Sequence, residues 1–301
     1  MLLVVRSILS FGLAAVLAVV GAACSGGESS AGADGRPHVV VTTSILGDIV
    51  GHVLGEQADV EVIMPVGADP HEFSPSTRQA EAMQDADLLV VNGAGLEQSM
   101  ADLIDGAGDV FTFADHVELR TLDGNPDPHL WNDPHAIAGA LAAFGAVAEA
   151  LPGVDRAVVE RQVASYVEEL DALDEEITTT LAPIPPAHRT LVTNHDSFGY
   201  FADRYDLRVI GAVIPSLTTS ASASAADLEA LAEVVRDQQV PAIFAETTQP
   251  TKLADALAAE VGSDVTVVEL YTESLGEPGS GADTYIGMLR TDAQRIAEAL
   301  A

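Results

Sequence analysis

The chain has one cysteine, one lysine and one tryptophan among its 301 residues. A single cysteine excludes an internal disulfide, so packing and hydrogen bonds must hold the fold together. Lysine and arginine together number 13 against 46 acidic residues, which gives a formal net charge of −33. So acidic a chain repels phosphate backbones, which argues against nucleic acid as a partner. We interpret most of this charge as a solvated surface and not as a specific site.

An apolar run near the N-terminus, Ile8–Val20, follows one early charge, Arg6. This run is shorter than the ~20 residues that a membrane-spanning helix needs. Small residues then lead to Cys24, and we interpret residues 1–23 as a signal peptide. Residues 24–36 are rich in glycine, serine and alanine, which is typical of a flexible tether. Acylation of Cys24 would anchor this tether to a membrane, although an ordinary cleaved signal with an incidental cysteine stays open.

The rest of the chain alternates short β-branched runs with helical patterns, which predicts parallel sheets covered by helices. We expect an α/β protein with two lobes, each containing a four-stranded, mainly parallel sheet flanked by helices. The expected strands are His38–Thr43, Val60–Pro65, Asp87–Asn92 and Val110–Phe113 in the first half, and Arg189–Thr193, Leu207–Val213, Val240–Ala245 and Val265–Leu270 in the second.

Between the two sets of strands, apolar residues recur at spacings of three and four from Val159 to Leu181. This period predicts one continuous helix of roughly 34 Å, which Pro183 then ends. We interpret residues 154–183 as a rigid link between an N-terminal lobe, residues 37–153, and a C-terminal lobe, residues 184–301. The alternative is that the helix packs on one lobe only.

Histidine and acidic residues follow the ends of several predicted strands. The triplet Asp-Pro-His occurs at 69–71 and again at 127–129, and His195 and Glu273 follow two strands of the second half. Because parallel sheets bind ligands outside the carboxyl ends of their strands, these side chains are expected to meet in the cleft between the lobes. Three imidazoles and one carboxylate suit a divalent metal ion. The candidate ligands are His71, His129, His195 and Glu273.

Three acidic residues are candidates for a supporting role around these ligands. Proline restricts its own φ and the residue before it, so each Asp-Pro-His copy positions its imidazole. Asp69 or Asp127 would accept a hydrogen bond from a ligand ring or a loop amide. Glu246, at the end of a strand, is either a partner of a ligand histidine or an exposed loop acid. Among the other histidines, only His135, at a helix start, stays a lesser candidate ligand.

Four segments resemble the signature motifs of one protein family. They are DPHEFSPS at 69–76, DPHLWNDP at 127–134, HDSFGY at 195–200 and YTESLG at 271–276. Over residues 37–301 the chain is similar to the zinc/manganese solute-binding lipoproteins of ABC importers, the cluster A-I or cluster 9 group. The resemblance implies two lobes joined by one long helix, with a metal ion in the cleft. It implies ligands at His71, His129, His195 and the acidic position 273.

The chain departs from this family pattern at two places. The acidic ligand position usually holds aspartate, whereas here it is Glu273, so its carboxylate extends one methylene further. Some zinc importers of the family carry a long loop rich in histidine and acidic residues before the second histidine motif. Between Leu96 and Asp127 this chain has only His116, so that loop is absent.

Nitrogen donors favour Zn²⁺, whereas Mn²⁺ prefers oxygen, and manganese members of the family typically have an acid at the position of His195. We expect a monomeric protein, lipid-anchored or periplasmic, that captures Zn²⁺ outside the cytoplasmic membrane and delivers it to the permease of an ABC importer. The same role with Mn²⁺ or another divalent metal is the main alternative, and a surface adhesin is another. A zinc hydrolase is disfavoured because the chain lacks a His-Glu-x-x-His motif and a nucleophile elbow, so we do not expect an enzyme.

Overall fold

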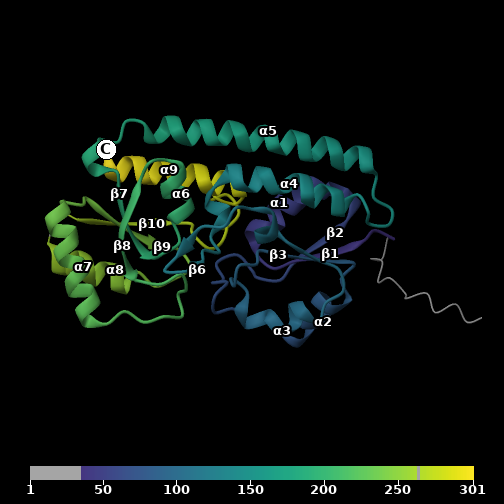
Figure 1. Cartoon of the computed structure of the whole chain (residues 1–301), viewed down its shortest axis with the longest axis horizontal. Helices are drawn as coiled ribbons and strands as arrows, with labels where there is room; N and C mark the ends of the chain where they lie inside the picture. Colours follow the sequence, from purple (N-terminus) through teal and green to yellow (C-terminus); the bar gives the residue numbers. More distant parts are fainter. Residues whose placement is uncertain (1–34, 263–264) are drawn as a thin grey trace, which may run out of the picture.

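The structure is a computed structural model in which residues 35–262 and 265–301 are described. The predicted signal peptide, Cys24 and nearly all of the tether lie outside the described residues. Within them, two α/β lobes lie side by side, and one long helix extends along both (Figure 1). This arrangement confirms the predicted fold class, while the predicted lobe boundaries stay predictions. No helix in these two ranges combines the length and the apolar character that crossing a membrane requires.

Each lobe is built on a four-stranded parallel sheet, and the two sheets share one topology. In both, the first strand in the sequence pairs with the second and the third, and the fourth pairs with the third. The N-terminal sheet has the order β2 (Asp59–Val62), β1 (His38–Val41), β3 (Leu88–Val91) and β4 (Val110–Thr112). The C-terminal sheet has the order β10 (Thr266–Leu270), β9 (Ala242–Glu246), β7 (Thr190–His195) and β8 (Arg208–Ile214).

All eight predicted strands are present, with ends that lie up to three residues from those predicted, and the shifts of β2 and β7 bear on the candidate ligands. Strand β2 ends at Val62 instead of Pro65, so the loop that carries His71 is longer than expected. Strand β7 continues through His195, because this residue pairs with Ile214 of β8. A further antiparallel hairpin, formed by β5 (Thr121–Leu122) and β6 (Asn125–Pro126), precedes the second Asp-Pro-His triplet.

The helices begin at the capping residues that their sequences supply. Ser76 and Ser224 form capping boxes with the residues three positions later, and Asp133 accepts hydrogen bonds at the start of a helix whose first residue is Pro134. Such caps satisfy the free amides of a first turn. The helices are α1 (Ser44–Leu54), α2 (Thr77–Asp85), α3 (Ala101–Asp105), α4 (Pro134–Ala148), α5 (Arg156–Leu181), α6 (Gly199–Arg204), α7 (Ala225–Gln238), α8 (Lys252–Val261) and α9 (Tyr285–Leu300).

Helix α5 is the long helix that the apolar period predicted. The predicted stripe faces inward, with Tyr166, Leu170 and Leu173 buried near its centre. The helix contacts α1 and α4 of the N-terminal lobe and α9 of the C-terminal lobe, as Figure 1 shows. The alternative that it packs on one lobe only is therefore wrong. A helix that packs on both lobes resists their separation, because any hinge motion would expose part of its apolar stripe.

A continuous hydrophobic core connects the lobes. One cluster of buried side chains includes Val39 of β1 and Phe244 of β9, together with the inner face of α5. Trp131, the single tryptophan, is 3% exposed and belongs to this cluster. Its indole N–H donates to the Thr272 carbonyl oxygen of the other lobe at 2.8 Å. The lobes are thus fixed against each other by shared packing.

Candidate metal centre

The four candidate ligands converge at the interface of the lobes. Their ligand atoms all lie within 4.8 Å of one another. The Nε2 atom of His129 is 3.3 Å from that of His71 and 3.1 Å from that of His195. Carboxylate oxygens of Glu273 lie 3.5–3.7 Å from the three Nε2 atoms. Four donors around a tetrahedral ion at 2.0–2.1 Å are separated by about 3.3 Å, so this arrangement fits one ion.

The candidate ligands come from four separate segments that the two sheets hold in place. His71 lies in the loop between β2 and α2, and His129 directly precedes the short helix Leu130–Asn132 that leads into α4. His195 is the last residue of β7, and Glu273 lies three residues beyond β10. The two C-terminal ligands therefore stand at strand ends, where parallel sheets place their sites. The N-terminal ligands reach the same point through the two Asp-Pro-His loops.

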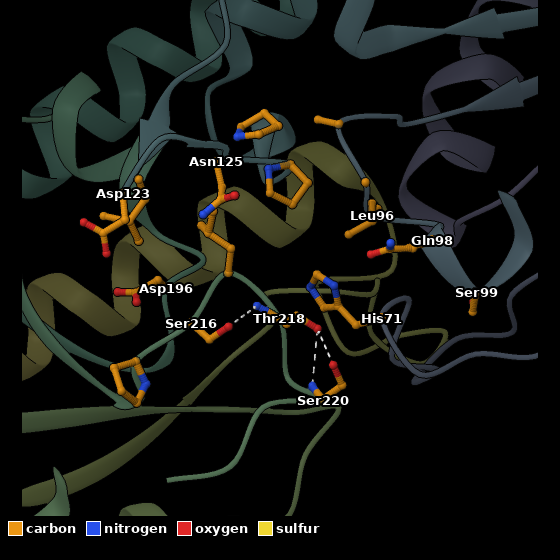
Figure 2. A pocket seen from close by; sticks show the side chains of 17 residues that line it. His71, Leu96, Gln98, Ser99, Asp123, Asn125, Asp196, Ser216, Thr218 and Ser220 are labelled. Atoms are coloured by element: carbon orange, nitrogen blue, oxygen red, sulfur yellow. Dashed lines mark hydrogen bonds between the residues drawn. The ribbon is translucent and has the colours of Figure 1, made fainter.

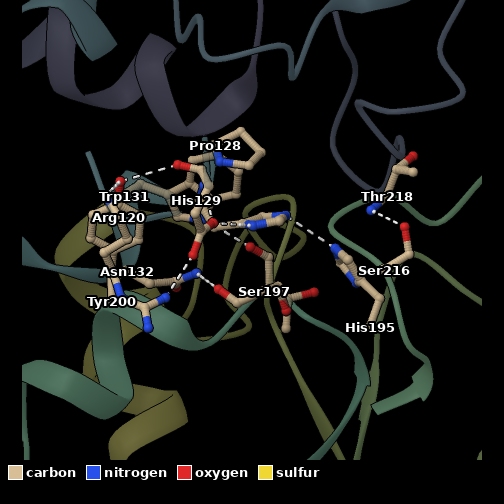
Figure 3. Close-up of polar contacts among 12 residues, drawn as sticks. Arg120, Pro128, His129, Trp131, Asn132, His195, Ser197, Tyr200, Ser216 and Thr218 are labelled. Carbon is tan, nitrogen blue, oxygen red and sulfur yellow. Dashed lines mark hydrogen bonds and ion pairs between the residues drawn. The ribbon is translucent and has the colours of Figure 1, made fainter. Parts of the chain in front are cut away.

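Asp127 fixes the ring of His129. Its Oδ1 accepts hydrogen bonds from the backbone amide of His129 at 3.1 Å and from the ring Nδ1 at 2.8 Å. Its Oδ2 accepts from the Arg120 guanidinium at 2.8 Å. Figure 3 shows Arg120 and His129 among the polar contacts of this region. Burial would raise the pKa of Asp127, but the hydrogen bonds from His129 and the Arg120 charge hold it below its usual value. An ionised partner at Nδ1 leaves the Nε2 lone pair directed at the other ligands.

Glu246 holds His195 in the corresponding way in the C-terminal lobe. It is the last residue of β9, is 1% exposed, and accepts a hydrogen bond from Nδ1 of His195 at 2.5 Å. Burial alone would lower the pKa of His195, but the Glu246 charge and this hydrogen bond raise the pKa to about 9. The reading of Glu246 as an exposed loop acid is therefore wrong, because both members of this pair are buried.

His71 is the candidate ligand whose ring has the least support. Among the described residues no hydrogen bond fixes its Nδ1, and its side chain is 4% exposed where those of His129 and His195 are fully buried. It borders a cavity of about 800 Å³ lined by both lobes, as Figure 2 shows. Burial, together with the neighbouring His129 and His195, lowers the pKa of His71 to about 2. Its imidazole is therefore neutral and free to donate its lone pair.

Glu273 is a buried carboxylate without a hydrogen-bond donor. Its side chain is fully buried, and neither of its oxygens has a hydrogen-bond partner among the described residues. Burial raises its pKa well above the usual value, although the His195 charge opposes this. A buried carboxylate is costly unless a cation pairs with it. Three imidazole nitrogens facing such a carboxylate form a donor set whose charge and geometry a divalent cation satisfies.

Proton release should accompany metal binding at this centre. Metal-free His195 holds its proton up to a pH of about 9, and a metal ion that binds its Nε2 must displace that proton. Metal affinity is therefore expected to fall as the pH falls below about 9, with one proton displaced per ion from His195 and a further proton wherever Glu273 is still protonated. Calorimetric titration at pH 7 in two buffers of different ionisation enthalpy measures this number. Glu246→Gln, which removes the charge that holds the proton, should reduce the release, and no release from the wild type would contradict this assignment.

Several supporting residues gave no usable signal in the sequence. Glu97 is buried and accepts hydrogen bonds from Thr42 and from the amides of Asn92 and Gly93. The Asn92 side chain in turn donates to the Pro128 carbonyl oxygen at 2.8 Å, which supports the loop carrying His129. Arg120 is an exception among the supporting residues, because the sequence marks it as the only lysine or arginine between Arg78 and Arg156.

His135, the lesser candidate ligand, is not part of this group of side chains. It is exposed, and its backbone amide donates to the Asp133 cap of α4 at 2.9 Å. Its position at the helix start therefore serves the cap, and its ring lies outside the centre.

Comparison with known proteins places this chain among metal-binding transport components. The family model described as zinc-uptake complex component A, periplasmic, matches residues 39–299. The zinc-binding protein TroA of Treponema pallidum is 31% identical over 287 residues, 91% of this chain and 92% of TroA. The manganese-binding lipoprotein MntA of Halalkalibacterium halodurans is 30% identical over 297 residues, 95% of this chain and 96% of MntA.

A solved structure shows the same fold. The periplasmic zinc-binding protein TroA from Treponema pallidum superposes with a TM-score of 0.84 at 30% identity, over 89% of this chain and 100% of that one. The family match covers nearly all described residues, and both relatives align along almost their whole length. The chain therefore belongs to the zinc-uptake complex component A family, the metal solute-binding proteins of ABC importers.

Proposed function

We propose that this protein captures Zn²⁺ at His71, His129, His195 and Glu273 and delivers it to the membrane permease of an ABC importer. The observation that supports this most strongly is the donor set, in which three imidazole nitrogens face one buried carboxylate. Nitrogen donors and four-coordinate geometry suit zinc, whereas manganese prefers oxygen and higher coordination. The proteins of this family are transport components and not enzymes, so we propose no hydrolytic role.

The residues that hold the ligand rings suit metal capture better than catalysis. Asp127 and Glu246 hold two of the ligand rings from behind, so both nitrogen donors are oriented before the ion arrives. Such support raises metal affinity and fixes which ring nitrogen binds. All four ligands bind the ion, which leaves no position for an activated water on a four-coordinate zinc. We propose release through motion of the loops, since the lobes share one core.

Manganese is the second candidate, because several of the relatives are named for it. Among them are MntA of Halalkalibacterium halodurans and the manganese ABC transporter substrate-binding lipoprotein PsaA of Streptococcus pneumoniae, the latter 28% identical over 295 residues. The relatives are also named as lipoproteins, which agrees with acylation of Cys24 and an extracytoplasmic location. Cys24 itself lies outside the described residues, so anchoring and the monomeric state stay proposals.

Metal competition tests the choice between the two ions. Protein purified without chelator should contain about one equivalent of zinc by elemental analysis, and added manganese should not displace it. We expect zinc to bind at least about 100-fold more tightly than manganese, because manganese stands at the weak end of the divalent series for nitrogen donors. Equal or tighter binding of manganese would reject zinc as the substrate while leaving the metal-import role in place.

A further inference from the structure

The two Asp-Pro-His triplets share one local turn but use their aspartates differently. In each, the aspartate Oδ1 accepts a hydrogen bond from the histidine amide two residues later, at 2.9 Å for His71 and 3.1 Å for His129. Asp127 also holds the ring of its own histidine at 2.8 Å. Within the described residues Asp69 makes no such bond to the His71 ring, and its second oxygen, Oδ2, has other partners than the Arg120 that Oδ2 of Asp127 binds.

That second oxygen connects the two lobes. Oδ2 of Asp69 accepts a hydrogen bond from the Thr219 hydroxyl at 2.7 Å and another from the Gln249 side-chain amide at 2.5 Å. Both donors belong to the C-terminal lobe, 150 and 180 residues away in the sequence. Thr219 is 6% exposed and lies in the segment that leads from β8 to α7. Hydrogen bonds of this kind to a carboxylate are stronger than those between neutral groups.

These contacts link the residues that support His71 with those that support His195 in the opposite lobe. Gln249 lies three residues after Glu246, and its backbone amide donates to the Glu246 carbonyl oxygen at 3.3 Å. Glu246 holds the ring of His195. On the other side, Asp69 holds the backbone of His71. The turn that supports one ligand is therefore hydrogen-bonded to the loop that carries the other.

The position of His71 makes this tie important for the ion. It is the one ligand that borders the cavity, and its ring is the one without a hydrogen bond at Nδ1 in the part of the chain that the structure describes. Residues next to Thr219, namely Thr218 and Ser220, line the same cavity (Figure 2). Loosening the loop at Asp69 would let this imidazole move away while the other three donors stay buried.

We propose that Thr219 and Gln249 are positioning residues which, through Asp69, hold His71 on the ion and so set the rate at which metal leaves. This inference rests on the proposed function of metal capture. The three residues form a latch, meaning a set of hydrogen bonds across the interface of the lobes. Opening the latch frees His71 while the core shared by the lobes stays intact. Because α5 holds the lobes together, such a local loop motion requires no separation of the lobes.

Isosteric substitutions at the two donors test the latch. Thr219→Val and Gln249→Leu remove the donors while nearly preserving side-chain volume, and neither residue is a candidate ligand. The probe is Zn²⁺ itself, with its dissociation into excess fluorescent chelator followed by stopped flow. We expect each variant to raise the dissociation rate about tenfold and the pair to raise it further, since each loses one hydrogen bond to a charged acceptor. Thr219→Ser, which keeps the hydroxyl, should release zinc at nearly the wild-type rate.

Thr218→Val is the matched control, because it makes the same change one residue earlier in the same segment. Within the described part of the chain the Thr218 hydroxyl bonds only to Ser220, so zinc release from Thr218→Val should stay within about twofold of the wild-type rate. In an Asp69→Ala background, the two donor substitutions should have no further effect, since their shared acceptor is gone. If the donor substitutions acted only by destabilising the fold, their effects on the release rate would add to that of Asp69→Ala. They would also lower the unfolding temperature of the metal-free protein in parallel.

The absorption spectrum of bound Co²⁺ separates the two possible failures. If the wild type gives a four-coordinate spectrum but the donor variants release zinc at the wild-type rate, the latch is rejected and metal capture stands. If the wild type itself lacks that spectrum, the proposed ligand set is wrong and the latch is rejected with it. A four-coordinate spectrum in every variant, with faster release in the donor variants alone, supports the latch.

Discussion

Glu273→Gln should lower zinc affinity by roughly a thousandfold, because it removes the one negative charge that faces the ion. Loss of a buried charged partner costs about 4 kcal/mol, which corresponds to about three powers of ten in affinity. The substitution keeps the volume of the side chain and leaves the three histidines unchanged. Competition of the purified variant with a chelator of known zinc affinity measures the loss.

The same substitution should leave the metal-free protein at least as stable as the wild type. Burial raises the pKa of Glu273 well above its usual value. Its ionisation therefore opposes folding: stability falls as the pH rises from the unfolded pKa near 4.5 through the folded pKa. Glutamine does not ionise, so this loss disappears, and urea unfolding of the metal-free variant at pH 7 should show a midpoint equal to or above that of the wild type.

Glu277→Gln is the matched control for both measurements, since it lies on the same loop but is exposed. It should change neither zinc affinity nor stability. Retention of zinc affinity within about tenfold in Glu273→Gln would show that this carboxylate is not a ligand.

His195→Asp combined with Glu246→Gln should shift the metal preference toward manganese. The substitution at 195 exchanges a nitrogen donor for oxygen, which manganese prefers. The companion change is needed because Glu246 lies 2.5 Å from the His195 ring. A carboxylate at 195 would face both Glu246 and Glu273 in a buried setting, where like charges repel strongly. An amide at 246 can instead donate to the new oxygen ligand.

We expect the double variant to lower the ratio of zinc to manganese affinity by on the order of 100-fold. His195→Asp alone should bind both ions weakly and unfold at a lower temperature than the wild type. Glu246→Gln alone keeps the three nitrogen donors, so its metal preference should match that of the wild type. An unchanged affinity ratio in the double variant would refute nitrogen donation by His195 as the source of zinc selectivity.

Local patterns account for what could be predicted of the fold. Alternation of β-branched runs and helical periods indicated two parallel sheets, and the stripe from Val159 to Leu181 indicated one long helix. These features depend on residues close together in the sequence, so they can be read without knowing the tertiary structure. The ends of β2 and β7 were misplaced because strand ends depend on pairing with a neighbouring strand. His195 is in β7 because Ile214, 19 residues later, lies beside it.

The sequence by itself determined the α/β class, the family resemblance and four candidate ligands, since each of these rests on local motifs and on the rule that parallel sheets bind ligands at strand ends. Only the tertiary structure decided that Glu246 is buried against His195, and that Asp69 accepts hydrogen bonds from Thr219 and Gln249. These contacts join loops without regular period across the interface of the lobes. Loop conformation is set by what the loop packs against, so such partners become visible only when both lobes are in place.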